Sequence, residues 1–264
     1  MDGIQIIAPN KLNAISKTEN FDSIDSAKVI IAKAMLIRED FNTYFGDERA
    51  TYPIIPGRIG IGKISAVSDN STSGFERGLR VFPHPETACG KCFDCFHGDK
   101  ENCSSFNVAG KNTDGFLRDF VVLKNEDISL LPPSVNDYGA LFIDHVAICD
   151  KVIDKLNLNK GDHVVIVGAD VTGIFLSQLV MYYQGIPVLV DNNQKNLDLA
   201  KRAGVYHTLF ADNKLEKSVS DITGARLSKK VVYMTGSNLN TDIALKLAGE
   251  HATVCLMGFG TPSI

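Results

Sequence analysis

The sequence predicts an α/β protein in which an N-terminal β domain precedes a C-terminal doubly wound parallel sheet of the Rossmann type. Two observations support this fold class. Up to about residue 131, short β-rich runs alternate with turn residues, whereas strands and helices alternate regularly beyond Gly161. A chain of 264 residues is long enough for two ordinary domains. We therefore expect a β domain over residues 1–143 and a Rossmann-type domain over residues 144–264.

In the first half, the β-rich runs are separated by Gly, Pro, Asn and Asp residues. Strands are expected at residues 3–7, 27–37, 59–67, 80–83 and 116–123. Short strands at this spacing are typical of an all-β, barrel-like domain.

In the second half, the hydrophobic period changes. Leu141, Ile148, Val152 and Leu156 recur at helical spacing and predict a helix that ends near residue 157 and bridges the two domains. The strands expected beyond it are 163–167, 187–190, 207–210, 230–234 and 253–257, and the helices are 172–184, 194–203, a segment ending near 223, and 241–248. Such alternation is typical of a parallel sheet with right-handed crossovers.

The composition excludes several classes of protein. Apolar residues make up 44% and charged residues 22%, which is ordinary for a soluble globular protein. The net charge of -4 favours neither nucleic acid nor an acidic membrane surface. No apolar run reaches the roughly 18 residues of a membrane span, and the N-terminus has no signal-peptide pattern. Six cysteines without a secretion signal indicate a reducing compartment, so we expect a cytoplasmic protein.

Four of the cysteines have metal-ligand spacing. Cys89, Cys92, Cys95 and Cys103 form the pattern Cys-x2-Cys-x2-Cys-x7-Cys. Four thiolates complete a tetrahedral zinc shell with no vacant position, so this zinc would be structural, with one ion per chain. Two disulfides or a chance cluster are the alternatives, but a reducing compartment disfavours disulfides. No other feature of the chain indicates an iron–sulfur cluster.

The segment around these cysteines resembles a known family. Residues 88–98 read Ala-Cys-Gly-Lys-Cys-Phe-Asp-Cys-Phe-His-Gly, and Asn102 and Cys103 follow. They closely resemble the structural-zinc lobe of zinc-containing medium-chain alcohol dehydrogenases. Residues 114–122 resemble that family's Gly-Gly-Phe-Ala-Glu-Tyr-Val-Val segment, and residues 52–62 resemble its segment leading into Gly-His-Glu. The resemblance implies a GroES-like β domain followed by a nucleotide-binding domain and a small-molecule substrate.

A nucleotide-binding loop is expected between the strand at 163–167 and the helix at 172–184. Residues 168–173 read Gly-Ala-Asp-Val-Thr-Gly. Gly168 would make the tight turn and Gly173 would allow close helix–strand packing, with the helix N-terminus facing the pyrophosphate. Asp191 ends the next strand, where an acid binds the ribose 2′-hydroxyl and selects NAD over NADP.

Asp170 departs from the glycine pattern of this loop. Aspartate tolerates unusual backbone angles, so we expect the turn to survive. Its carboxylate near a diphosphate would cost about 1–4 kcal/mol at ~4 Å, which predicts weak NAD binding. The alternative is a Rossmann core that no longer binds nucleotide.

The ligands of the family's catalytic zinc are not matched. When Asp40 is aligned with the Asp of the family's Cys-Gly-Thr-Asp, Ile37 falls at the cysteine and Asn42 at the relay histidine. When Gly57 is aligned with Gly-His-Glu, Arg58 falls at the histidine and Ile59 at the glutamate. Isoleucine offers zinc no ligand atom, and a protonated arginine repels it.

Only Asp144 matches a third metal ligand of the family. We therefore expect the catalytic zinc to be missing and assign no catalytic residue. Arg58, paired with Asp144 or Glu39, could supply positive charge where the metal stood. Another metal site built from Glu39, Asp144 and His145 is the alternative.

The resemblance implies an oxidoreductase that transfers hydride between NAD and a small alcohol, polyol or carbonyl compound. The alternative from another class is a non-catalytic, zinc-stabilised binding or scaffold protein with the same fold. Family members continue past the strand at 253–257 with strands that form the dimer, whereas this sequence stops at Ile264. The expected nucleotide-binding domain is therefore shortened, and a homo-oligomer would have to form without that segment.

Overall fold

The computed structural model describes residues 1–17, 21, 25–47, 49–68, 73–234 and 239–257. It divides into two compact units, Met1–Phe142 and Ile143–Ile264. The division falls one residue before the expected boundary because Ile143 is already the first residue of a helix.

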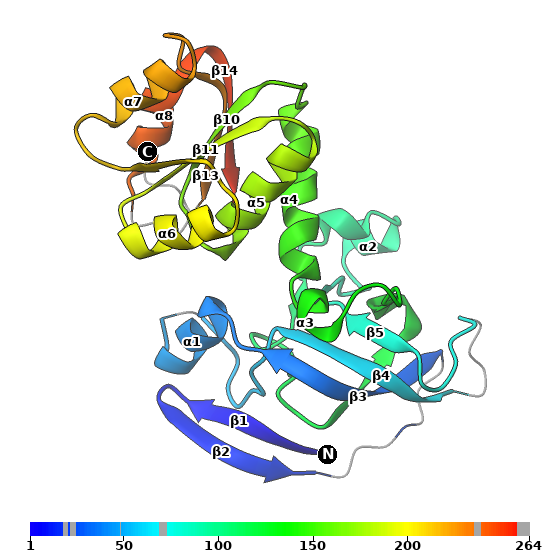
Figure 1. Cartoon of the computed structure of the whole chain (residues 1–264). Coiled ribbons are helices and arrows are strands. Elements are labelled where there is room, and N and C mark those ends of the chain that lie inside the picture. Colours follow the sequence, from blue (N-terminus) through cyan, green and yellow to red (C-terminus); the bar gives the residue numbers. More distant parts are fainter. Residues whose placement is uncertain (18–20, 22–24, 48, 69–72, 235–238, 258–264) are drawn as a thin grey trace. The chain divides into compact units, whose positions relative to one another are not determined.

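The first unit is built on a five-stranded antiparallel sheet with the order β8-β3-β4-β5-β9 (Figure 1). Its strands are β3 (Ser26–Met35), β4 (Ile59–Val67), β5 (Arg80–Pro83), β8 (Phe120–Lys124) and β9 (Ile128–Leu130). Ala27, Val29, Ile64, Val81 and Phe116 are buried in the core against this sheet. Removing such side chains from water is the main term that holds this layer together.

Smaller elements surround this sheet. Two pairs of strands form separate antiparallel ribbons, β1 (Asp2–Ala8) with β2 (Lys11–Ser16) and β6 (Glu86–Thr87) with β7 (Asn107–Val108). The helices are α1 (Arg38–Phe45), α2 (Phe93–Phe96), α3 (Asp137–Ala140) and the 3₁₀ turns Lys100–Asn102 and Asn125–Asp127.

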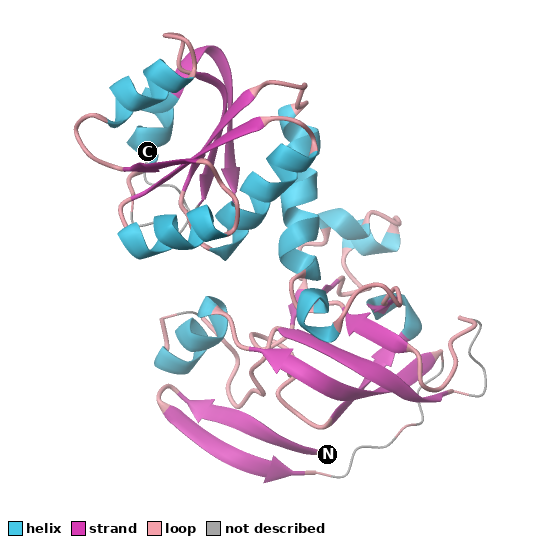
Figure 2. Cartoon of the chain, in the orientation of Figure 1, coloured by secondary structure: helices cyan, strands magenta, loops and turns pink. Residues whose placement is uncertain are grey.

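The second unit is a parallel sheet with the order β12-β11-β10-β13-β14, and Figure 2 shows its helices around the strands. The strands are β10 (His163–Val167), β11 (Ile186–Asp191), β12 (His207–Phe210), β13 (Ser228–Met234) and β14 (Ala248–Met257). The helices are α4 (Ile143–Leu156), α5 (Val171–Tyr182), α6 (Gln194–Arg202), α7 (Leu215–Ile222) and α8 (Thr241–Leu247). This order confirms the expected doubly wound sheet.

Both faces of this sheet are buried, which explains the uninterrupted apolar run in β10. Val164 and Ile166 pack into the cluster that includes α4, α5 and α6, whereas Val165 and Val167 pack into the cluster that includes α7 and α8. Alternate side chains of a strand point to opposite faces, so a strand covered on both sides needs apolar residues throughout.

Two expected strands of the first unit have other bounds in the structure, and one strand was not expected. The strand predicted over 27–37 ends at Met35, because Ile37 is instead the N-cap of α1. The strand predicted over 116–123 begins only at Phe120. Strand β2 was not predicted, since its residues are almost all exposed and carry no apolar alternation.

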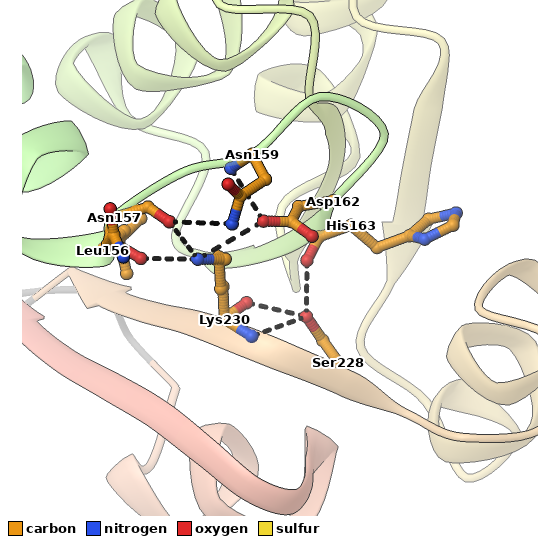
Figure 3. A network of polar contacts seen from close by, with 7 residues as sticks. All are labelled: Leu156, Asn157, Asn159, Asp162, His163, Ser228 and Lys230. Carbon is orange, nitrogen blue, oxygen red and sulfur yellow. Dashed lines mark hydrogen bonds and ion pairs between the residues drawn. The ribbon is translucent and has the colours of Figure 1, made fainter.

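Lys230 fastens the end of α4 to the start of β13 (Figure 3). Its ammonium donates to the carbonyls of Leu156 (2.5 Å) and Asn157 (2.6 Å) and lies 3.3 Å from Asp162 Oδ2. The last carbonyls of a helix have no partner within the helix, and a cation there also suits the helix dipole. Burial acts to raise the pKa of Asp162, but hydrogen bonding and the charge of Lys230 lower it overall.

We predict that Lys230→Met destabilises the second unit by about 1–3 kcal/mol, because two carbonyls lose a charged donor while the apolar stem remains. Urea unfolding followed by circular dichroism measures the change. Lys229→Met, next to it on an exposed position of β13, is the control. Equal stabilities of the two variants would contradict this role for Lys230.

Candidate functional site

The four cysteines converge in the first unit. Their sulfur atoms lie within 4.8 Å of one another. Cys89 Sγ is 4.0 Å from Cys95 Sγ, and Cys92 Sγ is 3.8 Å from Cys103 Sγ. Zinc–sulfur bonds of about 2.3 Å in a tetrahedron place sulfurs about 3.8 Å apart, so the cluster fits a zinc ion. Helix α2 begins immediately after Cys92 and carries Cys95, so the chain turns between these two cysteines.

Backbone amides face the sulfur atoms. The amides of Cys89 and Ser105 donate to Cys103 Sγ at 3.3 and 3.4 Å. Amide donors lower the pKa of Cys92 to about 6, whereas burial and the neighbouring thiols raise that of Cys95 to about 12. The Cys95 thiol therefore stays protonated unless a cation joins the cluster. With four protein ligands such an ion has no vacant position and holds the lobe together.

The loop after β10 has the backbone that the glycine pattern predicts. Gly168 has a φ of +112°, which favours glycine, and its amide donates to the Val190 carbonyl at 2.8 Å. A Cβ atom at Gly173 would lie 2.1 Å from the Gly168 carbonyl oxygen. Both glycines are therefore required for α5 to start so close to β10.

Asp170 caps α5. Its φ of -73° and ψ of -177° are ordinary extended values, so the turn forms with aspartate at this position, as expected. Its Oδ1 accepts a hydrogen bond from the Gly173 amide at 2.8 Å. Aspartate is a good N-cap because it satisfies an amide that the helix leaves unpaired. The carboxylate thus takes a donor at the helix end where a phosphate would bind.

Asp191 closes the same loop from the neighbouring strand. It is the last residue of β11 and is only 7% exposed. Its Oδ2 accepts from the Ala169 amide at 2.6 Å, and its Oδ1 accepts from the Asn193 amide at 2.7 Å. An ionised carboxylate has about four acceptor positions, so two remain for a ligand hydroxyl.

A second polar contact lies at the start of α5. His145 Nδ1 on α4 lies 3.1 Å from Thr172 Oγ1, and Cys149 Sγ one turn later donates to the Thr172 carbonyl at 3.5 Å. Burial, with the charge of Asp170, raises the pKa of Cys149 to about 12, so this thiol stays protonated. Thr172 was not singled out from the sequence, because a threonine early in a helix has no signature of its own.

In the first unit, Asp40 lies between the two segments that were aligned with catalytic zinc ligands. It is 3% exposed, and its carboxylate accepts from the amides of Gly57 (2.8 Å) and Ile37 (2.9 Å). Arg58 is 8% exposed, and its positive charge acts on Asp40. Burial raises the pKa of Asp40, although the amides and the charge of Arg58 act in the opposite direction.

The structure therefore brings Arg58 against Asp40, which the sequence prediction did not name as its partner. Asp144 and His145 lie on α4 in the second unit, and Glu39 lies next to Asp40 on α1. In the described part of the chain, the four cysteines are the one group of three or more His, Cys, Asp or Glu side chains placed to hold a metal. The signal that could have identified Asp40 is its place three residues after an N-cap, where acids bind the cap amide.

An apolar cavity of about 380 Å³ lies beside Asp40 within the first unit. Strands β1 and β2, helix α1 and the segment after Met35 contribute most of its walls. Its lining residues are Ile4, Ile6, Leu12, Leu36, Asp40, Phe41, Tyr44, Pro56 and Leu117.

Comparison with known proteins supports one family. Residues 24–133 match the alcohol dehydrogenase GroES-like domain. A zinc-type alcohol dehydrogenase-like protein of Haemophilus influenzae is 26% identical over 222 residues, or 83% of this chain and 65% of that protein. A sorbitol dehydrogenase of Halalkalibacterium halodurans is 28% identical over 233 residues, or 85% of this chain and 67% of that protein.

A solved structure covers both units. The crystal structure of the alcohol dehydrogenase RspB of Escherichia coli CFT073, complexed with NADH, has a TM-score of 0.85 and 25% identity, and it covers 99% of this chain and 77% of that one. Residues 24–133 therefore carry an alcohol dehydrogenase GroES-like domain, and the chain as a whole is similar to zinc-type alcohol dehydrogenases.

This alcohol dehydrogenase-like chain spans about two thirds of the length of the first relatives, 65% and 67%. Among its described residues, no helix is both long and apolar enough to cross a membrane. The family's cysteine lobe is present as a complete tetrathiol cluster. At the positions aligned with the family's catalytic zinc ligands, by contrast, Asp40 accepts hydrogen bonds from the amide of Ile37 and from the amide of Gly57, which precedes Arg58.

We predict one zinc ion per chain, measured by elemental analysis on protein purified under reducing conditions. Cys95→Ser should lower the zinc content and the melting temperature together, because a structural zinc contributes folding free energy directly. Cys255→Ser, which changes a cysteine outside the cluster, is the control. Two metals per chain, or none in the unoxidised protein, would contradict the prediction.

Proposed function

We propose that this chain is an NAD-dependent oxidoreductase of the cytoplasm that transfers hydride between the cofactor and a small alcohol, polyol or carbonyl compound. The observation that carries the proposal is the loop at Gly168 and Gly173 with Asp191 at the end of the next strand. The names of the relatives support it, since one is a sorbitol dehydrogenase and another was crystallised with NADH.

Each residue of the loop would act on a particular part of NAD. Gly168 makes the tight turn and Gly173 lets α5 pack close to β10, so that the N-terminus of α5 supplies partial positive charge to the pyrophosphate. Asp191 would accept hydrogen bonds from the adenosine ribose and repel a 2′-phosphate. Bound NAD supplies the nicotinamide ring that accepts or returns the hydride.

We propose that Arg58 stabilises the substrate oxygen in place of the family's catalytic zinc. Negative charge grows on that oxygen during the reaction, and a guanidinium stabilises it by hydrogen bonds and charge. Asp40 holds the segment of Arg58 by accepting the Gly57 amide. The residue that takes the alcohol proton is unassigned.

A non-catalytic, zinc-stabilised binding protein is the second candidate. Two observations favour it, the Asp170 carboxylate at the phosphate end of α5 and the missing metal ligands at Ile37 and Arg58. The two candidates differ in whether NAD is reduced when a substrate is supplied.

We predict that NAD binds more tightly than NADP, and that both bind weakly. Asp170→Asn should tighten NAD about tenfold, because it keeps a capping oxygen and removes one negative charge from the phosphate site. Isothermal calorimetry measures the affinities. Asp150→Asn, on the exposed side of α4, is the control for net charge. Tighter binding of NADP would contradict the role of Asp191, and an unchanged affinity in Asp170→Asn would place that carboxylate away from the phosphates.

We also predict that added zinc does not stimulate oxidation of primary alcohols, secondary alcohols or polyols. Catalytic zinc needs three protein ligands and one vacant position, whereas Ile37 presents methyl groups and Arg58 a cation. Arg58→Gln should lower any zinc-independent kcat/KM, and the double variant Ile37→Cys, Arg58→His tests whether zinc dependence returns. Zinc-dependent, chelator-sensitive oxidation by the unmodified chain would direct the search to Glu39, Asp144 and His145.

A further inference from the structure

Asp191 joins two separate segments at the carboxyl end of the parallel sheet. One is the loop after β10, through the Ala169 amide, and the other is the turn before α6, through the Asn193 amide. Asn193 itself is the N-cap of α6 and accepts from the Lys195 amide at 3.0 Å. The carboxylate therefore sets the positions of the phosphate loop and of the neighbouring helix start at once.

Two successive amides of the loop after β10 donate hydrogen bonds to the last two residues of β11. The Gly168 amide donates to the carbonyl of Val190, and the next amide, that of Ala169, donates to the side chain of Asp191. The first hydrogen bond extends the pairing of β10 with β11. The second takes the place of the backbone hydrogen bond that would form if the pairing continued by another residue. These two bonds orient the peptide that leads into the N-terminus of α5.

Burial makes the second bond hard to replace. Asp191 is 7% exposed and Ala169 is 1% exposed. A buried amide without an acceptor costs about 1–3 kcal/mol, and a hydrogen bond to a charged group is stronger than one between neutral groups. A substitution that removes the carboxylate would therefore leave the Ala169 amide to find a new acceptor by moving the loop.

We propose that Asp191 is a positioning residue for the phosphate loop in addition to selecting the ribose, an inference that rests on the proposed NAD site. If Asp191 selected only the ribose, a smaller neutral residue would admit the 2′-phosphate of NADP and leave the rest of the site intact. With both oxygens holding backbone amides, the same change disturbs the place where the diphosphate of either cofactor binds. A single substitution at Asp191 then weakens NAD without gaining NADP.

The experiment separates the two roles with a ligand that lacks the adenosine ribose. Reduced nicotinamide mononucleotide carries one phosphate and the nicotinamide, so it cannot contact Asp191 through an adenosine ribose. In Asp191→Ser we expect its affinity to fall about tenfold or more, equal to about 1.4 kcal/mol, and NADPH affinity to remain at or below that of the native chain. Asp191→Asn, which keeps one carbonyl acceptor, should lose less.

Amide hydrogen exchange gives a readout that needs no cofactor. In Asp191→Ser the amides of Ala169 and Asn193 should exchange about tenfold faster or more relative to the core amides of β10. Lys230→Met is the matched control, because it removes polar bonds at the opposite end of the same sheet. It should lower stability and leave the exchange of Ala169 and the mononucleotide affinity unchanged relative to the core.

Two outcomes overturn the inference. One is unchanged exchange of Ala169 in Asp191→Ser, and the other is a gain of NADPH affinity with unchanged mononucleotide affinity. Failure of the native chain to bind NADH or the mononucleotide is a different result, since it refutes the proposed function. In that case the exchange of the Ala169 amide still decides whether Asp191 positions the loop.

Discussion

Each unit depends on a buried carboxylate that accepts backbone amides from a distant segment. In the second unit Asp191 binds the Ala169 amide, and in the first unit Asp40 binds the Gly57 amide. A buried carboxylate is costly unless donors satisfy it, and a buried amide is costly without an acceptor. Each hydrogen bond therefore satisfies a buried carboxylate and a buried amide at once. The loops that it fixes are the ones on which the proposed cofactor and substrate sites depend.

The two carboxylates differ in what else they face. Asp191 faces two amides, so its charge is held by dipoles that also shape the loop. Asp40 faces Arg58, so a buried cation and a buried anion share one place in the first unit. Removing either charge removes an attraction that offsets part of the cost of burying the other, which is more damaging than losing an exposed ion pair. Arg58 is therefore part of the fold of the first unit as well as the proposed partner of the substrate oxygen.

The sequence predicted those features that leave a local pattern. The spacing of Cys89, Cys92, Cys95 and Cys103 predicted a lobe in which the four sulfurs meet, and the alternation of strands and helices beyond Gly161 predicted a doubly wound parallel sheet. The position of the Arg58 charge near Asp40 left no such pattern, because the two residues are brought together only when β4 and α1 have formed. Strand β2 was missed for the related reason that its pairing with β1, and not its burial, makes it a strand.

The position of Asp170 shows how one residue can serve the fold and oppose a ligand. A cap at the N-terminus of α5 stabilises the helix whether or not a nucleotide is present, and a glycine there would give most of that stability. The negative charge of Asp170, however, lies at the helix N-terminus, whose partial positive charge would otherwise attract a diphosphate. Binding NAD must then displace the capping bond to Gly173 or place two like charges together. The zinc lobe has no such conflict, because its four thiolates and a cation have complementary charges. The tetrathiol cluster can therefore stabilise its lobe without affecting the proposed cofactor site. At the start of α5, by contrast, the same backbone amides are needed by the Asp170 cap and by a bound diphosphate.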